Sequence, residues 1–161
     1  MGLLQPHVRH RGRHREARLS GDAKAITIHT LRQAKAAAAA AAHTGAPVLL
    51  LSAHGAAGSV GPAWFAAVVD AAKAAYPEAS LEGLLDCAGT PGYALAALRQ
   101  GLKRIRYDGA AFDAIADIAA QDGATVWRER PPALDLAAAA DDDGPEAMAA
   151  LVASCSRWLL A

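Results

Sequence analysis

Short apolar runs alternate with helical segments along most of this sequence, and turn residues separate one from the next. Residues Val48–Ser52 form a run of strand length, which is typical of a strand buried on both faces of a parallel sheet. The alanine-rich segment 31–43 before it favours helix and ends at Thr44-Gly45, where glycine can close a helix. Repetition of this unit predicts right-handed βαβ crossovers and a parallel sheet.

The repeat can be followed through a series of expected strands and helices. The strands are expected at residues 25–29, 48–52, 81–86, 103–107 and 125–129, and the helices at residues 31–43, 62–75, 93–100 and 112–121. A glycine loop over residues 54–61 follows the second strand. At 161 residues the chain is well short of the roughly 250 residues of a closed eight-stranded barrel. We therefore expect one α/β domain of about five strands with an unclosed sheet.

The two ends of the chain break the repeat. Residues 1–22 are expected to form a disordered basic arm, because residues 7–18 hold five arginines and one glutamate without apolar periodicity. The α/β domain is expected over residues 23–132, and an acidic Ala/Asp linker over residues 133–143. Residues 144–161 are expected to form an amphipathic helix. Its apolar positions are Met148, Leu151, Val152, Cys155, Trp158 and Leu159.

The formal net charge of zero conceals an uneven distribution of charge. The whole chain has 16 basic and 16 acidic residues, so removing the five arginines and one glutamate of the arm leaves 11 basic and 15 acidic residues. A body with a net charge of −4 is not expected to carry a nucleic-acid interface, although the arm could bind a polyanion.

The number of cysteines and the hydropathy of the sequence indicate the cellular compartment that we expect for the protein. Cys87 and Cys155 are too few for a disulfide framework, which favours a reducing compartment and therefore the cytoplasm. No apolar stretch of the sequence approaches the length of a membrane span, so no membrane partner is expected.

Candidate functional residues follow the expected strands, because parallel sheets bind ligands at the carboxyl ends of their strands. The residues expected there are His54, Gly55, Asp86, Cys87, Asp108 and Glu129. Among the histidines that follow the arm, which are His29, His43 and His54, only His54 is expected at this end of the sheet.

Each candidate also has a purely structural interpretation. Asp86 can bind a ligand or cap the glycine-containing turn that follows it. Cys87 can serve as a small buried apolar residue. Asp108 with Gly109 can form a turn, and His54 can lie solvated in its glycine loop.

Several of these positions carry a family resemblance. Residues 53–61 (AHGAAGSVG) are similar to a strand-end loop of the class II, zinc-dependent fructose-bisphosphate aldolases. Tyr76-Pro77 then leads, nine residues later, to Asp86 at a strand end, and Asp108-Gly109 follows in the same register. The resemblance covers about residues 26–130, the first half of that barrel, and implies a partial TIM barrel in which Asp86 occupies the position of the proton-transferring aspartate.

The chain departs from the family's pattern at the residues that would bind zinc and substrate. Cys87 stands where the resemblance places a zinc histidine, and Ala53 stands where it places a serine, with Ser52 expected to face the other side of the strand. Glu129 is the glutamate retained from a Val-Glu-x-Glu pattern. The other zinc ligands belong to the missing half, and catalytic zinc needs about three protein ligands. We therefore expect no zinc and no other cofactor.

Three functions remain open from the sequence. The first is an aldolase-like protein without catalysis that acts as a scaffold or binds a small, phosphorylated metabolite. The second is an active carbon–carbon lyase on a phosphorylated sugar, which uses Asp86 in a site completed by a second subunit. The third is polyanion or nucleic-acid binding through the arm. Whether the protein is an enzyme is left open.

Self-association is expected from the shortage of strands. Five strands cannot close a barrel, so the sheet keeps two edges and one face without an opposite wall. The terminal helix of residues 144–161 can cover this surface in its own chain or in a two-fold partner. We expect a homo-oligomer, in particular a homodimer.

Removal of residues 1–20 is expected to leave the thermal stability unchanged, because this segment has no apolar periodicity with which to dock. Calorimetric melting temperatures of the full and truncated chains test this. A fall of more than about 4 °C, on the order of 1 kcal/mol for a domain of this size, would show that the arm packs on the body.

Overall fold

A computed structural model describes residues 23–139 and 142–161 of the chain. The basic arm expected over residues 1–22 lies outside the described residues, as do residues 140–141 of the expected linker.

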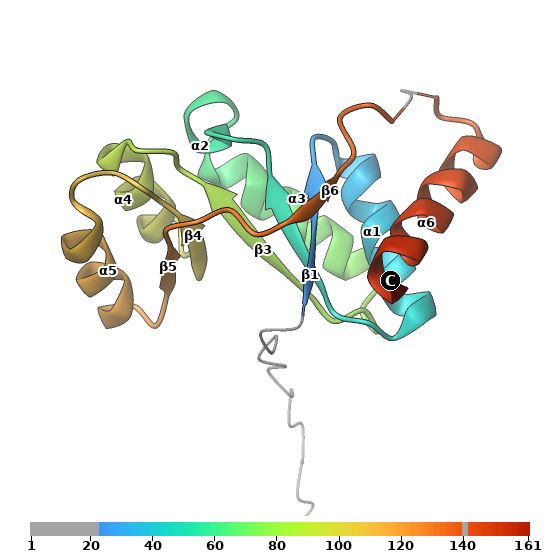
Figure 1. Ribbon diagram of the computed structural model, residues 1–161, viewed down its shortest axis with the longest axis horizontal. Helices are drawn as coiled ribbons and strands as arrows, with labels where there is room; N and C mark the ends of the chain where they lie inside the picture. The colour runs from blue at the N-terminus through green and yellow to red at the C-terminus, as the bar shows by residue number, and fades with distance from the viewer. Residues whose placement is uncertain (1–22, 140–141) are drawn as a thin grey trace, which may run out of the picture.

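The described residues form a parallel sheet with the strand order β5-β4-β3-β2-β1-β6, as Figure 1 shows. The strands are β1 (Lys24–Ile28), β2 (Val48–Ser52), β3 (Leu81–Asp86), β4 (Arg104–Arg106), β5 (Thr125–Trp127) and β6 (Ala133–Asp135). Every adjacent pair is parallel. The expected α/β class with a parallel, partial-barrel arrangement of βαβ units is confirmed, with six strands in place of about five.

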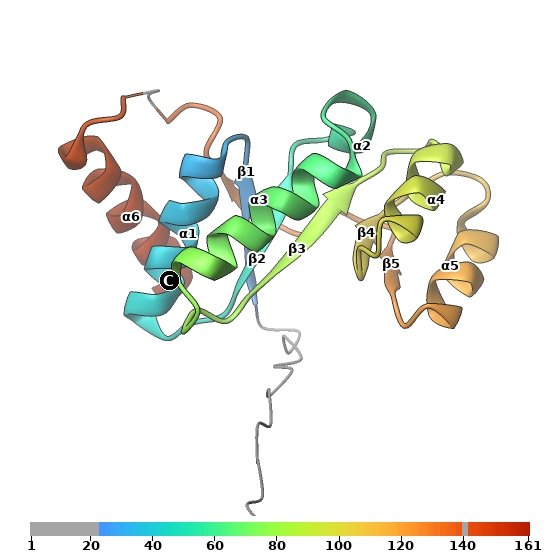
Figure 2. The same cartoon turned by 180° about the vertical axis from the view of Figure 1, so that it is seen from behind.

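Most of the helices cover one face of this sheet. The described helices are α1 (Leu31–Thr44), the short α2 (Ala56–Ser59), α3 (Pro62–Ala75), α4 (Pro91–Arg99), α5 (Phe112–Gln121) and α6 (Pro145–Leu160). In Figure 2 helices α1, α3 and α4 lie in front of the strands, whereas in Figure 1 they lie behind them. Successive right-handed crossovers that move in one direction along a sheet place their helices on the same side, as in a barrel.

Helix α1 shows how the alanine-rich composition is used. The Thr30 side chain caps the helix by accepting a hydrogen bond from the Gln33 backbone N–H, and Gly45, with φ of 71°, ends it in the left-handed region. The alanines from Ala36 to Ala41 are buried on several sides of the helix. Because alanine is small, α1 packs closely against the sheet, α3 and α6 at once.

Alternation along the strands divides the apolar residues into two clusters. The larger cluster lies between the sheet and the helices and includes Ile26, Leu50 and Phe65. The smaller cluster, on the opposite face, consists of Ala25, Leu49, Leu51 and Leu84. Trp127 and Ala133 pack against this second cluster. The segment from Trp127 to Ala133, hereafter the strap, crosses this face in Figure 1 and covers part of the surface that the far wall of a closed barrel would cover.

Three expectations about elements need correction. Residues 133–135, expected within a linker, form strand β6, which pairs with β1. Their sequence, Ala-Leu-Asp, has little strand propensity, so the pairing with β1 determines the conformation. The fifth strand ends at Trp127 rather than at residue 129, because the chain turns there to start the strap. Part of the expected glycine loop, residues 56–59, forms helix α2.

Helix α6 packs on its own chain. Leu151, Cys155 and Leu159 are buried, and α6 lies against α1. The indole nitrogen of Trp158 donates a hydrogen bond of 2.9 Å to the Ala25 carbonyl oxygen, and Lys24 donates one of 3.1 Å to the Trp158 carbonyl oxygen. This packing uses the apolar stripe on which the expectation of self-association rested, and the oligomeric state remains a prediction.

Within the described residues, each helix is too short or too polar to cross a membrane.

Substitution of Gly83 by alanine is expected to destabilise the fold by about 1–3 kcal/mol, because a Cβ there would overpack the core. It would lie 2.8 Å from Val69 Cγ2 and 3.0 Å from Phe65 Cε1, and both side chains are buried. Urea unfolding measures the change. The matched control is Gly92→Ala in the first turn of α4, where no heavy atom lies within 4 Å, and an unchanged or higher stability is expected there. Equal effects at both positions would contradict the packing argument.

Candidate functional site

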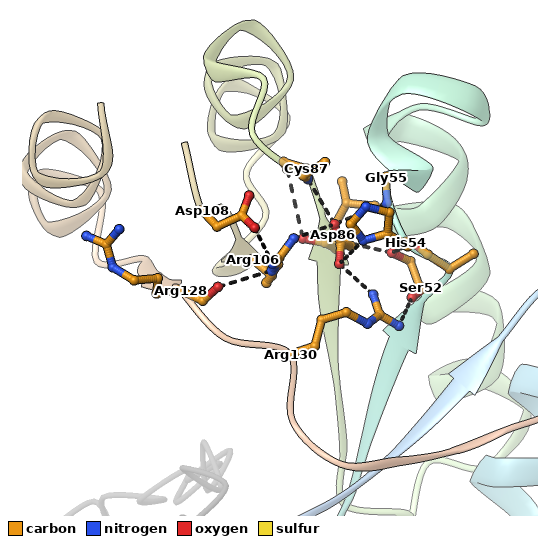
Figure 3. A network of polar contacts seen from close by, with 12 residues as sticks. Ser52, His54, Gly55, Asp86, Cys87, Arg106, Asp108, Arg128 and Arg130 are labelled. Atoms are coloured by element: carbon orange, nitrogen blue, oxygen red, sulfur yellow. Dashed lines mark hydrogen bonds and ion pairs between the residues drawn. The ribbon is translucent and has the colours of Figure 1, made fainter. Parts of the chain in front are cut away.

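Polar side chains meet where strands β2, β3 and β4 end, at the carboxyl edge of the sheet. Figure 3 shows them gathered around Asp86, the last residue of β3. His54 and Gly55 come from the loop after β2, Arg106 from the end of β4, and Arg130 from the strap. This is the end of a parallel sheet at which ligands commonly bind.

Asp86 is the centre of the site and is fully buried. Its Oδ1 accepts hydrogen bonds from the backbone N–H groups of Ala88 (2.8 Å) and Gly55 (3.1 Å), and Arg106 Nη1 lies 3.5 Å away. Its Oδ2 accepts a hydrogen bond of 2.5 Å from Arg130 Nη1. Both carboxylate oxygens are therefore occupied by groups of the protein itself.

These contacts set the protonation state of Asp86. Burial by itself would raise the pKa of this carboxyl group. The hydrogen bonds from Arg130, Ala88 and Gly55 and the charge of Arg106 outweigh burial, so the pKa of Asp86 lies below its ordinary value. Asp86 is consequently a carboxylate at neutral pH.

Arg106 joins two carboxylates to the strap. Besides its contact with Asp86, its Nη2 donates to Asp108 Oδ2 at 2.5 Å, and its Nε donates to the Arg128 carbonyl oxygen at 3.1 Å. The guanidinium thus uses several of its donors in fixed directions, as its planar fork allows. The Arg128 guanidinium lies 3.9 Å from the centre of the Phe112 ring, a cation–π contact that holds the start of the strap on α5.

Arg130 holds the middle of the strap. Its Nη2 donates a hydrogen bond of 3.1 Å to the Ser52 carbonyl oxygen while its Nη1 bonds Asp86. Ser52 Oγ in turn accepts a hydrogen bond of 2.9 Å from the Asp86 backbone N–H. The strap is thereby fastened across the ends of β2 and β3.

His54 is the most open member of the site. Its side chain is 68% exposed, and its Nδ1 lies 3.6 Å from Asp86 Oδ2. This pair is an ion pair when the imidazole is protonated, and the rest of the ring remains free to meet a ligand.

Cys87 points away from this network. Its side chain is fully buried within the helix-side cluster, with Sγ 3.9 Å from the Leu85 carbonyl oxygen. Burial, with a smaller contribution from the Asp86 charge, raises the pKa of the thiol to about 12, which disfavours the thiolate that binds zinc. Among residues 23–139 and 142–161, no three His, Cys, Asp or Glu side chains gather as a metal site would require.

The remaining candidates occupy different positions. Gly55, with φ of 65°, contributes its backbone N–H to Asp86. Asp108 is partly exposed and pairs with Arg106. Glu129 is exposed on the strap, outside the network around Asp86. The structure thus brings Asp86, His54, Gly55 and Asp108 together at one edge.

A second histidine also lies at this edge, contrary to expectation. His29 follows β1, and its Nε2 lies 2.7 Å from Asp135 Oδ1 at the end of β6. Hydrogen bonding to His29 is the main reason why the pKa of Asp135 is lowered, and Arg130 contributes through its charge. The expectation was wrong because His29 directly follows the carboxyl end of β1, a position that its place at the end of the expected strand 25–29 already indicated.

The sequence interpretation missed Arg106, Arg130 and Ser52. Ser52 does face away from the expected ligand side, but its Oγ and carbonyl oxygen still reach the network. A signal for Arg106 existed, because it alternates with buried Ile105 and therefore shares a face with Asp86 on the neighbouring strand. Arg130 had no such signal, since the strap brings it to Asp86 from 44 residues away.

Comparison with known proteins gives no assignment: no protein-family model matches the sequence, and no curated protein matches it.

Replacement of Asp86 by asparagine is expected to reduce the free energy of unfolding by about 3–5 kcal/mol, because it leaves two arginines without their buried partner. Urea unfolding at pH 7 measures this loss. Asp108→Asn is the matched control, since this aspartate is partly exposed and meets one arginine, so a loss below about 1 kcal/mol is expected.

The wild-type protein and the Asp86→Asn variant also test the pKa of Asp86. A carboxyl group with a lowered folded-state pKa contributes stability above its unfolded value, about 3.9, and loses it as the pH falls through the folded value. The difference between wild type and Asp86→Asn should therefore be constant from about pH 7 to 5 and shrink below about pH 4. A difference that stays constant in acid would contradict the lowered pKa.

Proposed function

We propose that this chain is an aldolase-like α/β protein without lyase activity, which binds a small phosphorylated metabolite at the carboxyl edge of its sheet. The observation that carries the proposal is the environment of Asp86. This carboxylate is fully buried, and both of its oxygens accept hydrogen bonds from the protein.

Proton transfer is a poor role for such a group. A general acid or base works best when its pKa is near the working pH and when it reaches the substrate. The pKa of Asp86 is lowered, and the Arg130 guanidinium covers one oxygen while two backbone N–H groups cover the other. The contacts around Asp86 favour a role in holding the site together.

Groups that could meet a ligand surround this buried centre. The His54 ring is largely exposed, the Arg130 side chain is 27% exposed, and the Asp108 side chain is 42% exposed. Imidazole and guanidinium donors suit the oxygens of a phosphate or carboxylate, and an aspartate oxygen suits a sugar hydroxyl. This set supports a small, polar, anionic ligand. The free, buried state of both cysteines suits the cytoplasm, which remains part of the proposal.

The alternative of a lyase completed by a second subunit receives less support. One route to such a dimer was the crossing of the terminal helix to a partner, whereas α6 buries its apolar stripe on α1 of the same chain. Polyanion binding through the arm concerns residues outside the described part of the chain.

The purified protein is expected to carry no stoichiometric zinc and to leave fructose 1,6-bisphosphate uncleaved, because Cys87 is a buried, protonated thiol and Asp86 is held by arginines. Elemental analysis and a coupled aldol-cleavage assay test both statements. Near-molar zinc, together with turnover that Asp86→Asn abolishes, would contradict the proposal.

Binding is tested separately by thermal shift with fructose 1,6-bisphosphate and dihydroxyacetone phosphate. A ligand at 100 times its Kd stabilises the folded state by about 2.7 kcal/mol, which is readily seen as a higher melting temperature. His54→Ala should weaken binding by about tenfold without lowering the melting temperature of the free protein, because His54 is exposed. The control is His43→Ala, at the exposed end of α1. Equal losses for both variants, or no shift with either sugar phosphate, would count against this binding site.

A further inference from the structure

A polar groove opens at the amino end of the sheet, away from the site around Asp86. It lies between the first half of β3 and the segment that leads into β4, and has a volume of about 700 Å³. Helix α3 contributes Asp70 and Lys73 to its walls, β3 contributes Glu82 and Gly83, and the β4 side contributes Lys103. Figures 1 and 2 show β3 running diagonally away from β4 at this end.

The groove exists because β3 pairs with its two neighbours at different heights. Residues 81–84 pair with β2, but the pairing with β4 begins only at Leu85 and Asp86. Within residues 23–139 and 142–161, no strand pairs with residues 81–84 on the side of β4. This stretch is therefore an open strand edge inside the sheet.

The direction of the backbone groups along β3 follows from two hydrogen bonds. Val48 N donates to the Ser80 carbonyl oxygen on the β2 side, and Cys87 N donates to the Arg106 carbonyl oxygen on the β4 side. In a parallel ladder, successive residues point their N–H and C=O groups to alternate sides. The backbone groups of Leu81 and Gly83 consequently face the groove, where they present two donors and two acceptors in strand register.

We propose that this groove binds an extended, acidic segment of another polypeptide, which adds to the Leu81–Gly83 edge of β3 as a further strand. An extended backbone offers donors and acceptors at the spacing of the edge, as in recognition by strand addition. This inference is independent of the function proposed for the carboxyl edge.

The charge of the walls selects an acidic segment. Glu82 and Arg104 form an ion pair, so their charges balance each other. The remaining charged residues of the walls are the negative Asp70 and the positive Lys73 and Lys103. Lys103 Nζ is held by a hydrogen bond of 2.7 Å to the Asp122 carbonyl oxygen, so its charge stays at the wall. The groove therefore has an excess of one positive charge, which disfavours the arginine-rich residues 7–18 of this chain as its occupant.

Amide hydrogen exchange of the full chain, followed by NMR, tests the proposal with synthetic hexapeptides. The probe is TETETE, which combines strand propensity with negative charge, at about 2 mM because short strand-addition peptides bind weakly. We expect the exchange of the Leu81 and Gly83 amides to slow by about tenfold or more. Unchanged exchange at both amides would overturn the proposal. So would amides that are already protected without peptide but lose their protection on removal of residues 1–20, since the arm would then occupy the edge.

Two comparisons separate strand addition from simple charge attraction. The peptide TEPETE keeps the charge of TETETE but interrupts the strand, because proline replaces the central threonine, and equal protection by it would overturn backbone pairing. The double variant Lys73→Glu with Lys103→Glu should weaken TETETE binding by about tenfold, whereas Lys35→Glu on α1, outside the groove, should leave it unchanged. Equal binding by both variants would contradict the selection of acidic segments.

Discussion

The buried carboxylate of Asp86 is the interaction on which the carboxyl edge of this protein depends. A carboxylate removed from water needs compensating charge and hydrogen bonds, and Asp86 receives them from four separate segments. Gly55 belongs to the loop after β2, Ala88 to the turn after β3, Arg106 to β4, and Arg130 to the strap. Because each segment supplies part of the compensation, loss of any one makes the burial of Asp86 more costly.

The strap follows from the same constraint. An unclosed sheet exposes the face that would line the interior of a barrel, here Leu49, Leu51 and Leu84. Trp127 and Ala133 cover these side chains, and the arginines between them fix the strap to the strand ends. The chain then reaches the far edge of the sheet, where β6 pairs with β1. A short irregular segment thus performs part of the covering that further strands perform in a closed barrel.

The sequence predicted the elements whose signal is local. Strand Val48–Ser52 and helix α3 were predicted with their observed bounds, because a continuous apolar run and a proline-started helix each carry their own evidence. Strand β6 and the network of Arg130 were missed, since both depend on partners about 100 and 44 residues away. The sequence identified the place of Asp86 in the fold. That both of its carboxylate oxygens accept hydrogen bonds from the protein could be recognised only once the strap was placed.

The hydrogen bonds that occupy both oxygens of Asp86 also link the stability of this fold to what the carboxylate can do to a substrate. To act on a substrate, the carboxylate would have to give up Arg130 or the backbone donors, and a buried charge without its partner costs about 3–5 kcal/mol. A ligand that binds at this edge would gain more from the exposed His54 ring and the outer side of Arg130, which it can reach with the network intact. The same contacts that hold the unclosed sheet together therefore support the proposed binding role more than proton transfer by Asp86.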